Sequence, residues 1–436
     1  MKNNQLMSCR YLAVILLITL LFFSNACINS DREVSKPTFN VPNTVIIESV
    51  ELEVRDADGI DLGDFTGNGK IDILTSNGDY GTTMWFEQGD TWKDWTRHHI
   101  YTIADAPREI EGNALGDFNG DGHLEAISLD QPNGNIYLHK RGDDVRGDWE
   151  TAIILSDRQL VQEALVTDID GDGRPDLVYT WEGREIGNGG VYWLKLTGDN
   201  PLNPDHWQDH IMTTHESAWW LAPHRADISG NGKAIDFVFT ARHHRGRNPG
   251  SRPGLFWMEP NGDVTAPWTV RTIDETLEHP LHVDMGDLSG EGHGLDLVVG
   301  GFNTSIIYWY EYSKNWKRHE LPVPVIKGVQ PDRVWNVKTL RLGGEREGIF
   351  APVNLEVRGQ DEDDDIREAG AWLFYEYLNG QFQPAILREI DYRHPTDDRI
   401  MLFDVTGDGQ AELFIPDSGP DINLLHILRL GRDWPE

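Results

Sequence analysis

The sequence predicts an all-β fold, a seven-bladed β-propeller, and three observations lead to this prediction. A short acidic motif with a central glycine recurs about every 50 to 60 residues. Residues that favour β-strands flank each copy of the motif. Each repeat also holds four segments with the composition of strands. Four-stranded units that repeat in this way are typical of propeller blades, so seven repeats predict seven blades.

The clearest copy of the motif carries four acids around its glycine turn. They stand at relative positions 1, 3, 5 and 9, as Asp168, Asp170, Asp172 and Asp176. Ca²⁺ takes about six to eight oxygen ligands, and alternate carboxylates with a backbone carbonyl supply them. The spacing is similar to the start of an EF-hand loop, but the flanking segments favour strands rather than helices. We therefore predict a calcium loop that forms the turn of a β-hairpin.

Five further loops carry side-chain oxygens in this pattern. Three keep the regular spacing, namely Asp64, Thr66, Asn68 and Asp72, then Asp117, Asn119, Asp121 and Glu125, and finally Asp404, Thr406, Asp408 and Glu412. Two have one extra residue before the last acid, namely Asp227, Ser229, Asn231 and Asp236, and Asp287, Ser289, Glu291 and Asp296. A seventh copy, residues 340–350, keeps the strand pattern without the ligands. We predict several bound Ca²⁺ ions and expect the tightest binding at the loops that begin at Asp117, Asp168 and Asp404.

The N-terminal segment has the features of a bacterial export signal. Two basic residues precede an apolar run that is too short to span a membrane as a mature helix, and a small residue stands before Cys27. We predict a lipoprotein-type signal over 1–27 with a lipid on Cys27, a polar tether over 28–42 and the propeller over 43–436. The protein is then an outer-membrane or cell-surface lipoprotein, or periplasmic if it is not lipidated. Because the other cysteine, Cys9, lies in the signal, the mature chain has no disulfide.

The strands can be placed repeat by repeat. In the second repeat the four strand segments are 113–116, 125–129, 135–140 and 149–155. The last repeat has only three strands, which end near Leu430, while 44–48 is a lone strand before the first loop. We expect this N-terminal strand to complete the last blade, which removes an open sheet edge.

Composition narrows the class of partner. The formal net charge is −34, which argues against binding to nucleic acid. We expect contact with a membrane only through the N-terminal lipid, and a monomer. Aromatic residues recur in the third strands, where we expect them to pack between blades. His98, His99, His210 and His319 recur in fourth strands, which indicates a scaffold role.

These loops between apolar strands resemble the FG-GAP or VCBS repeats of integrin α-subunit heads and many bacterial surface proteins. The resemblance covers nearly the whole mature chain, although the sixth repeat departs from the pattern. It implies the propeller fold and calcium binding. It does not select a function, because such propellers include adhesins, lectin-like modules, polysaccharide lyases and sugar dehydratases.

In the geometry of that family the calcium hairpins lie on one face, so we searched the opposite face for a site. Counting back from the first calcium Asp, the odd positions should line the channel. Candidate catalytic residues on this basis, or in the segments that enter the first strands, are Glu163, His224, His282, Arg333 and Arg399. Candidate substrate-binding residues are Trp219 and Trp220 with a basic turn in the fourth repeat that contains His243, His244, Arg245 and Arg247.

Two classes of function remain open at this point. The first is an exported enzyme that acts on an anionic polysaccharide, or a lyase or dehydratase of uronates or keto-sugars. In it a histidine serves as base, a tyrosine such as Tyr80 or Tyr392 as acid, and an arginine neutralises the carboxylate. In a variant of this reading, His224, His282 and Glu163 hold a transition metal in the funnel. The second is a non-catalytic surface module that binds glycan or protein through Trp219 and Trp220.

Overall fold

The computed structural model describes residues 44–432 apart from 79, 106, 183–188, 216–217, 223–225, 243–251, 314, 343–345, 356–368, 391–398 and 418–423. All of the described residues fall within one compact unit of the chain, Phe39–Glu436. The predicted signal, Cys27 and the tether lie outside the described residues, so they stay predictions. No helix in the described part of the chain is long and apolar enough to span a membrane.

The described residues form seven antiparallel sheets, which confirms the predicted all-β seven-bladed propeller. Blade one contains β2 (Ala57–Gly63), β3 (Asp72–Asn77), β4 (Thr82–Gln88) and β5 (Trp95–Thr102). Blade two contains β6 (Ile110–Gly116), β7 (Glu125–Asp130), β8 (Asn135–Arg141) and β9 (Trp149–Leu155). Blade three contains β10 (Val161–Thr167), β11 (Asp176–Trp181), β12 (Gly190–Leu196) and β13 (Trp207–Thr213), with a short 3₁₀ turn, η1 (Pro204–His206), before β13.

The second half of the ring repeats this order. Blade four contains β14 (Ala218–Leu221), β15 (Phe237–Ala241), β16 (Gly254–Glu259) and β17 (Thr269–Asp274). Blade five contains β18 (Pro280–Gly286), β19 (Asp296–Gly301), β20 (Ile306–Glu311) and β21 (Lys317–Pro322). Blade six contains β22 (Arg333–Val334), β23 (Lys338–Leu340), β24 (Gly348–Leu355), β25 (Ala369–Leu378) and β26 (Gln381–Ile390). Blade seven contains β27 (Met401–Phe403), β28 (Glu412–Asp417), β29 (Leu424–Arg432) and β1 (Thr44–Glu53).

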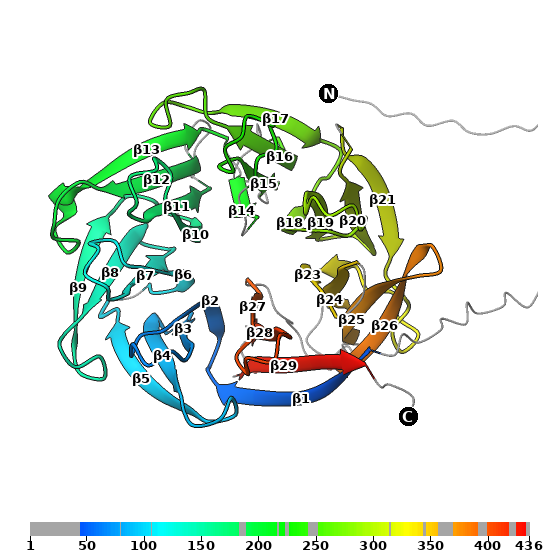
Figure 1. Ribbon diagram of the computed structural model, residues 1–436, viewed down its shortest axis with the longest axis horizontal. Coiled ribbons are helices and arrows are strands. Elements are labelled where there is room, and N and C mark those ends of the chain that lie inside the picture. The colour runs from blue at the N-terminus through cyan, green and yellow to red at the C-terminus, as the bar shows by residue number, and fades with distance from the viewer. Residues whose placement is uncertain are drawn as a thin grey trace, which may run out of the picture. The chain divides into compact units, whose positions relative to one another are not determined.

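The two ends of the described chain meet in blade seven. β1 pairs antiparallel with β29, so one sheet contains both the first and the last strand (Figure 1). Figure 1 also shows that the first strand of each blade stands nearest the middle of the ring, whereas the fourth stands outermost. Side chains on the first strands and on the turns beside them can therefore converge from several blades.

The core lies between neighbouring blades. The cluster between blades two and three, for example, brings Ile127 and Leu138 against Leu177 and Tyr179, and all four are fully buried. Such face-to-face packing of sheets buries the apolar side of each strand. Three tryptophans of the third strands, Trp85, Trp193 and Trp372, have no exposed surface. The aromatic third strands are therefore core, as their recurrence suggests.

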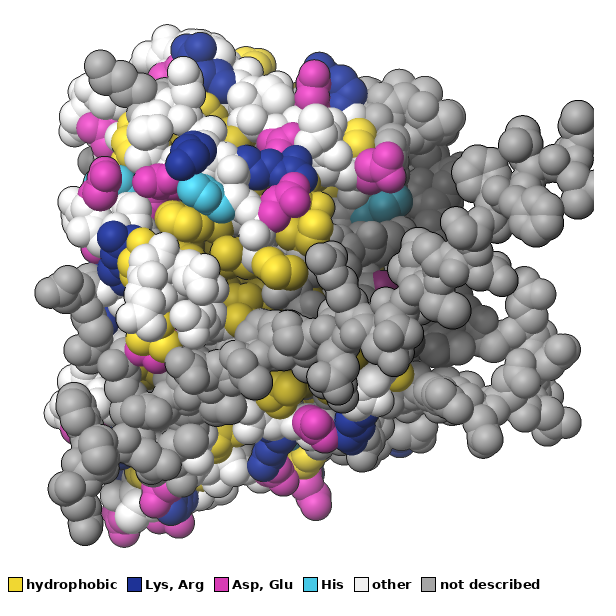
Figure 2. Space-filling view, turned by 90° about the vertical axis from the view of Figure 1, so that its right-hand side faces the viewer, with side chains coloured by type: hydrophobic (Ala, Val, Ile, Leu, Met, Phe, Trp, Pro, Cys, Tyr) yellow, Lys and Arg dark blue, Asp and Glu magenta, His cyan; other side chains and the backbone are white. Residues whose placement is uncertain are grey.

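Three of the fourth-strand histidines also have structural contacts. His98, His210 and His319 stack on Trp85, Trp193 and Trp309, with ring centroids 4.4, 4.6 and 4.2 Å apart. Over the side of the propeller drawn in Figure 2, acidic and basic side chains are interspersed. The excess negative charge of the chain does not exclude local pairs of opposite charge there.

A buried polar cluster between blades one and two predicts an acid-sensitive step. His139 is fully buried, and its two ring nitrogens lie 3.0 Å from the Ser128 hydroxyl and 2.8 Å from the Thr151 hydroxyl. Burial lowers the pKa of His139 to about 3, because the charged imidazolium loses its hydration. In the unfolded chain this histidine takes up its proton near pH 6.5. The folded protein therefore loses stability as pH falls below about 6.5, and it goes on losing stability until the pH reaches the folded pKa.

We expect His139→Gln to reduce this loss. The amide can keep hydrogen bonds to both hydroxyls but cannot take up a proton. Relative to its own stability at pH 6.5, the variant should retain about 2–3 kcal/mol more than the native chain at pH 4.5, since each unit of pKa shift corresponds to about 1.4 kcal/mol. Urea unfolding at the two pH values measures the difference, with exposed His123→Gln as control. Equal losses in native and variant protein would show that His139 does not control acid stability.

Candidate functional site

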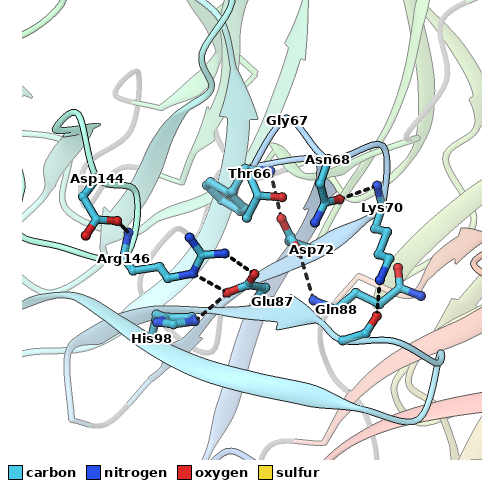
Figure 3. Close-up of polar contacts among 12 residues, drawn as sticks. Thr66, Gly67, Asn68, Lys70, Asp72, Glu87, Gln88, His98, Asp144 and Arg146 are labelled. Carbon is cyan, nitrogen blue, oxygen red and sulfur yellow. Dashed lines mark hydrogen bonds and ion pairs between the residues drawn. The ribbon is translucent and has the colours of Figure 1, made fainter.

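Each acidic loop joins the first and second strands of its blade and is held by hydrogen bonds to its own acids. In blade one the Asp64 carboxylate accepts hydrogen bonds from the amides of Gly67 and Gly69, each at 2.7 Å. These two glycines have φ angles of 72° and 82°, which other residues rarely adopt. Asp72, the ninth-position acid, accepts a hydrogen bond from the Gln88 amide at 3.0 Å (Figure 3). The turn is thus shaped before any ion enters it.

The ninth-position acids are buried, and burial changes their titration. It raises the pKa of Asp72 to about 6 and the pKa values of Glu125 and Asp176 to about 7. The cause is the loss of water around the charged carboxylate. A divalent cation in the loop would favour the charged form of each acid.

The donor set of the blade-three loop fits Ca²⁺. Carboxylate oxygens of Asp168, Asp170 and Asp176 all lie within 4.8 Å of one another. Oxygen-only ligands suit a hard cation such as Ca²⁺ rather than a transition metal. The sixth blade again lacks these acids, as the sequence indicates.

In the six blades with an acidic loop, the third strand places one residue beside the ninth-position acid. The charge of this residue differs according to whether loop position five is aspartate. In three blades this residue is a cation that contacts the aspartate at loop position five: Lys140 with Asp121 at 2.8 Å, Lys195 with Asp172 at 2.7 Å, and Arg429 with Asp408. In blades one, four and five the residue is Glu87, Glu259 or Glu311, and position five is not aspartate. In these three loops the cation therefore compensates the aspartate at position five, whereas Glu291, the carboxylate at that position in blade five, has no third-strand cation beside it.

The glutamates in the other blades are paired outside the loop. Glu87 pairs with Arg146 of the next blade and with His98, at 3.1 Å for the histidine (Figure 3). Glu259 likewise pairs with Arg271 at 2.5 Å. Two classes of loop therefore exist: in blades two, three and seven a third-strand cation pairs with the aspartate at position five, and in blades one, four and five the third strand places a glutamate there instead.

On the opposite side of the blades, an aromatic cavity of about 320 Å³ forms between blades two to six. We call it the aromatic cavity, and the lining residues that matter for its chemistry are Glu111, Gln162, Glu182, Trp219, Trp220, Arg242, Phe302 and Trp335. Four aromatic side chains, two carboxylates, two amides (Gln131 and Gln162) and one guanidinium thus meet in a single hollow.

Two recurring strand positions supply most of this lining. Glu111, Gln162 and Trp219 are each the second residue of a first strand, β6, β10 or β14. Glu182, Arg242 and Phe302 each follow directly after a second strand, β11, β15 or β19. The cavity is therefore built on the rigid edges of the sheets.

The cationic and aromatic groups of the cavity contact one another. The Arg242 guanidinium lies 3.1 Å from the centroid of the Trp219 ring and 5.8 Å from that of Phe302. Arg333 lies 5.0 Å from the Phe302 centroid and 5.1 Å from the Trp335 centroid. Guanidinium groups over aromatic faces are held by cation–π attraction. Positive charge is thus fixed at the wall of this cavity.

The cavity also contains a buried donor. Gln162 is 2% exposed, and its side-chain Nε2 has no hydrogen-bond partner among the described residues. A buried amide without a partner costs free energy, and such groups are rare in folded proteins. A polar ligand in the cavity could accept this hydrogen bond.

Of the predicted catalytic residues, His282 and Arg333 lie beside the aromatic cavity. The His282 ring stacks on Trp220, with centroids 3.9 Å apart, and is 6% exposed. Trp220 rather than His282 lines the hollow. Arg333 packs behind Phe302 and Trp335 and is 7% exposed. Both predicted tryptophans, Trp219 and Trp220, do line the cavity.

Glu163 and Arg399 do not line the aromatic cavity, and they pair with each other. Their ion pair joins blade three to blade seven across the ring, and Arg399 also donates to the Ala164 carbonyl at 2.6 Å. Arg399 lines a second, central cavity of about 480 Å³ together with Asp61 and Lys338. Burial lowers the pKa of Arg399 to about 10 and raises that of Asp61. These charges neutralise one another within the ring and do not meet His282 at one site.

The remaining predicted site residues lie outside the described residues: His224, His243, His244, Arg245, Arg247 and Tyr392. The proposed transition-metal set of His224, His282 and Glu163 therefore has one member that the structure does not describe. Tyr80, a candidate acid, lies in the turn of blade one, where Arg55 stands 4.3 Å from its ring centroid. It is not among the residues that line the aromatic cavity.

Glu182, Phe302 and Trp335 were not selected from the sequence, whereas Glu111 and Gln162 belong to the segments that enter the first strands and Arg242 belongs to the basic turn. The signal was available for three of them, because Glu182, Arg242 and Phe302 share the position directly after the second strand. Only the structure indicates that this position faces the hollow.

Comparison with known proteins supports the repeat assignment. A family model described as an FG-GAP-like repeat matches residues 64–128 and 117–179. No curated protein matches the sequence.

Among solved structures, a lectin of Agrocybe aegerita that recognises terminal N-acetylglucosamine is 14% identical, with a TM-score of 0.44, over 84% of this chain and 87% of that one. An α-L-arabinanase of Penicillium chrysogenum is 11% identical, with a TM-score of 0.42, over 79% of this chain and 99% of that one. A calcium-binding regucalcin of Agrobacterium tumefaciens is 10% identical, with a TM-score of 0.41, over 78% and 93%. At such identities and scores none of these likenesses bears on the function of this chain.

Proposed function

This chain carries FG-GAP-like repeats within a seven-bladed β-propeller, and from the aromatic cavity of that propeller we propose that it binds an anionic carbohydrate and cleaves it by β-elimination. The observation that carries the proposal is the composition of one hollow: four aromatic side chains together with Glu111, Glu182 and Arg242. Ligand sites combine apolar walls with a few fixed polar groups in this way.

Each kind of group has a counterpart in a uronate sugar. The C–H face of a pyranose ring packs on an aromatic face, for which Trp219 and Trp220 are placed. Its hydroxyl groups can accept from the Nε2 of Gln162, whose donor has no partner among the described residues. Its carboxylate can pair with Arg242, since a guanidinium binds a carboxylate through two parallel hydrogen bonds.

The elimination needs three tasks from the protein. A base removes the proton at C5, the C–H electron pair forms a double bond between C4 and C5, and the bond from C4 to the leaving oxygen breaks as that oxygen takes a proton from an acid. Glu111 and Glu182 are the acidic side chains in the cavity that can take and return these protons. Arg242 offsets the charge that develops on the carboxylate as the C5 proton leaves. His282 remains a second candidate base, next to Trp220.

We also propose that the loops of blades one to five and seven bind structural Ca²⁺, and that the chain is an exported lipoprotein anchored through Cys27. The all-oxygen donors of the loops support the first part. The apolar run before Cys27 supports the second. Bound Ca²⁺ would supply the positive charge that the buried ninth-position acids need.

The direct test is digestion of uronate polysaccharides such as polygalacturonate and alginate. New reducing ends together with new absorbance at the ultraviolet edge, where unsaturated uronates absorb, are the expected result. New reducing ends without that absorbance would indicate hydrolysis and would overturn the elimination. A second candidate function, a non-catalytic glycan-binding module, is favoured by the four aromatic side chains. It predicts binding by affinity electrophoresis without any product.

A further inference from the structure

The aromatic cavity has a neighbour that shares one of its walls. A cavity of about 210 Å³ is lined by segments 276–280 and 300–304 and by Tyr308, and we call it the adjacent cavity. Phe302 lines both hollows. Pro280 lines the adjacent cavity and the next residue, Leu281, lines the aromatic one. The two hollows are therefore contiguous along the mouth of blade five.

The shared wall is fixed by the backbone on both sides. The Phe302 amide donates to the His279 carbonyl at 3.0 Å, and the Thr304 amide donates to the Asp332 carbonyl at 2.7 Å. These bonds tie the turn of blade five to the segment that precedes β18 and to the segment that precedes β22. The Phe302 ring also meets Trp335 edge-on, with centroids 5.0 Å apart. Phe302 is thus held in place as a wall between the two cavities.

Groups that suit a sugar are present beyond this wall. Tyr308 is partly exposed, and the Arg318 guanidinium lies 4.3 Å from the centroid of its ring. Glu278 and Asn303 are exposed, and Asn303 has a φ angle of 53°, so the turn is compact at this point. The adjacent cavity therefore repeats, on a smaller scale, the combination of aromatic and polar groups found in the aromatic cavity.

The volumes of the two cavities indicate whether the ligand is short or long. Ligand sites have volumes of about 300–1,000 Å³, and the aromatic cavity alone is at the lower limit of that range. Two contiguous hollows with a single aromatic divider suit a chain of sugars better than a single sugar. Two guanidinium groups stand near the Phe302 ring, since Arg242 and Arg333 lie 5.8 and 5.0 Å from its centroid. A chain that passes Phe302 keeps positive charge beside it.

We propose that the adjacent cavity is a second sugar subsite, and that the ligand is an oligosaccharide of at least two units that extends from the aromatic cavity past Phe302 to Tyr308. This inference rests on the proposed function, because it assigns the substrate length of that site. It adds Tyr308, Asn303 and Glu278 as residues that determine which chain lengths bind well.

The test is binding of galacturonate and alginate oligomers of one to six units, measured by calorimetry on the whole protein. We expect affinity to rise at least tenfold between the monomer and the tetramer. Tyr308→Ala should remove most of this gain, by about tenfold for the tetramer, and leave the monomer unchanged. Tyr312→Ala, beyond the other end of β20, is the matched control and should change neither.

The experiment tests the proposed function and the second subsite separately. If no oligomer of either series binds the native protein, the proposed function fails for uronates and the subsite fails with it. If oligomers bind, but monomer and tetramer bind equally or Tyr308→Ala weakens both by the same factor, the aromatic cavity stands and the second subsite is overturned. Asn303→Gly gives an independent check, because glycine removes the side chain and readily adopts the φ of 53° at this exposed turn position.

Discussion

Glu182→Gln is expected to reduce product formation by about 10²–10⁴-fold while leaving oligosaccharide affinity within a fewfold of the native value. The substitution keeps the size and one oxygen of the side chain but removes its ability to exchange a proton, and losses of this size are usual for a general acid or base. Glu182 is 1% exposed, so the near-isosteric amide should fit the same space. Initial rates from absorbance at the ultraviolet edge, compared with calorimetric affinity, measure the two effects.

Two further variants serve as a test of binding and as a control. Trp219→Ala should weaken binding by at least about tenfold, because it removes a ring face and the platform on which Arg242 rests. Glu150→Gln, at an exposed position of β9, is the control and should change nothing. If Glu182→Gln turned over at the native rate, the acid–base pair would have to be sought among other groups.

His282→Ala separates two roles for the histidine that the sequence selects. If His282 is the base, its loss abolishes turnover and leaves affinity nearly intact. If it only supports Trp220, on which it stacks, affinity falls and the rate at saturating substrate does not. The contact geometry favours the second outcome, because Trp220 stands between the His282 ring and the hollow.

Removal of calcium is expected to lower the melting temperature by roughly 10 °C or more. A ligand that binds only the folded state adds about 2.7 kcal/mol per site at a hundredfold excess over Kd, and six loops carry ligands. Both cysteines, Cys9 and Cys27, precede residue 28, so no disulfide within the propeller can replace this contribution. Calorimetric melting in calcium and in EGTA, with magnesium as control, measures the shift. Superimposable melting curves would contradict the calcium proposal.

Substitution of Lys195, the cation beside the blade-three loop, provides a second test of calcium binding. The Lys195 ammonium contacts both Asp170 and Asp172, so an entering Ca²⁺ competes with it. Lys195→Met should therefore raise the calcium affinity of the blade-three loop by about tenfold, or about 1.4 kcal/mol, and lower the stability of the calcium-free protein. Lys93→Met removes an exposed lysine that pairs with Glu48 away from the loops, and should do neither. A calcium titration in which the two variants agree would show that Lys195 does not compete.

Much of the fold follows from residues that are near one another in the chain. The glycines at Gly67 and Gly69 have the positive φ angles that the loop needs, and alternating β-formers on either side define the hairpin. Each blade is a local unit of consecutive strands, so its boundaries are visible in the sequence. The pairing of β1 with β29 agrees with the expectation drawn from their spacing around the loops.

The residues of the candidate site were harder to predict from the sequence, because the first strands have an irregular register near their starts. Strand alternation, continued backward from the loop, selects Glu163 and His282, five residues before Asp168 and Asp287, the first acids of their loops. In the structure the register shifts within these strands, between Val161 and Ala164 in β10 and between Pro280 and Val283 in β18. A bulge changes which side chains face a given side. The neighbours Gln162 and Leu281 line the hollow instead.

By itself, then, the sequence determined the number of repeats, the strands, the calcium-type loops and two of the tryptophans that line the cavity, Trp219 and Trp220, because each depends on short-range pattern. Only the tertiary structure decided that Glu111 of blade two, Glu182 of blade three and Trp335 of blade six meet in one cavity, while Arg399 of blade seven pairs with Glu163 of blade three. The physical reason is that closure of the ring and small register shifts are long-range effects. They fix which side chains converge at the mouth, and no local pattern records them.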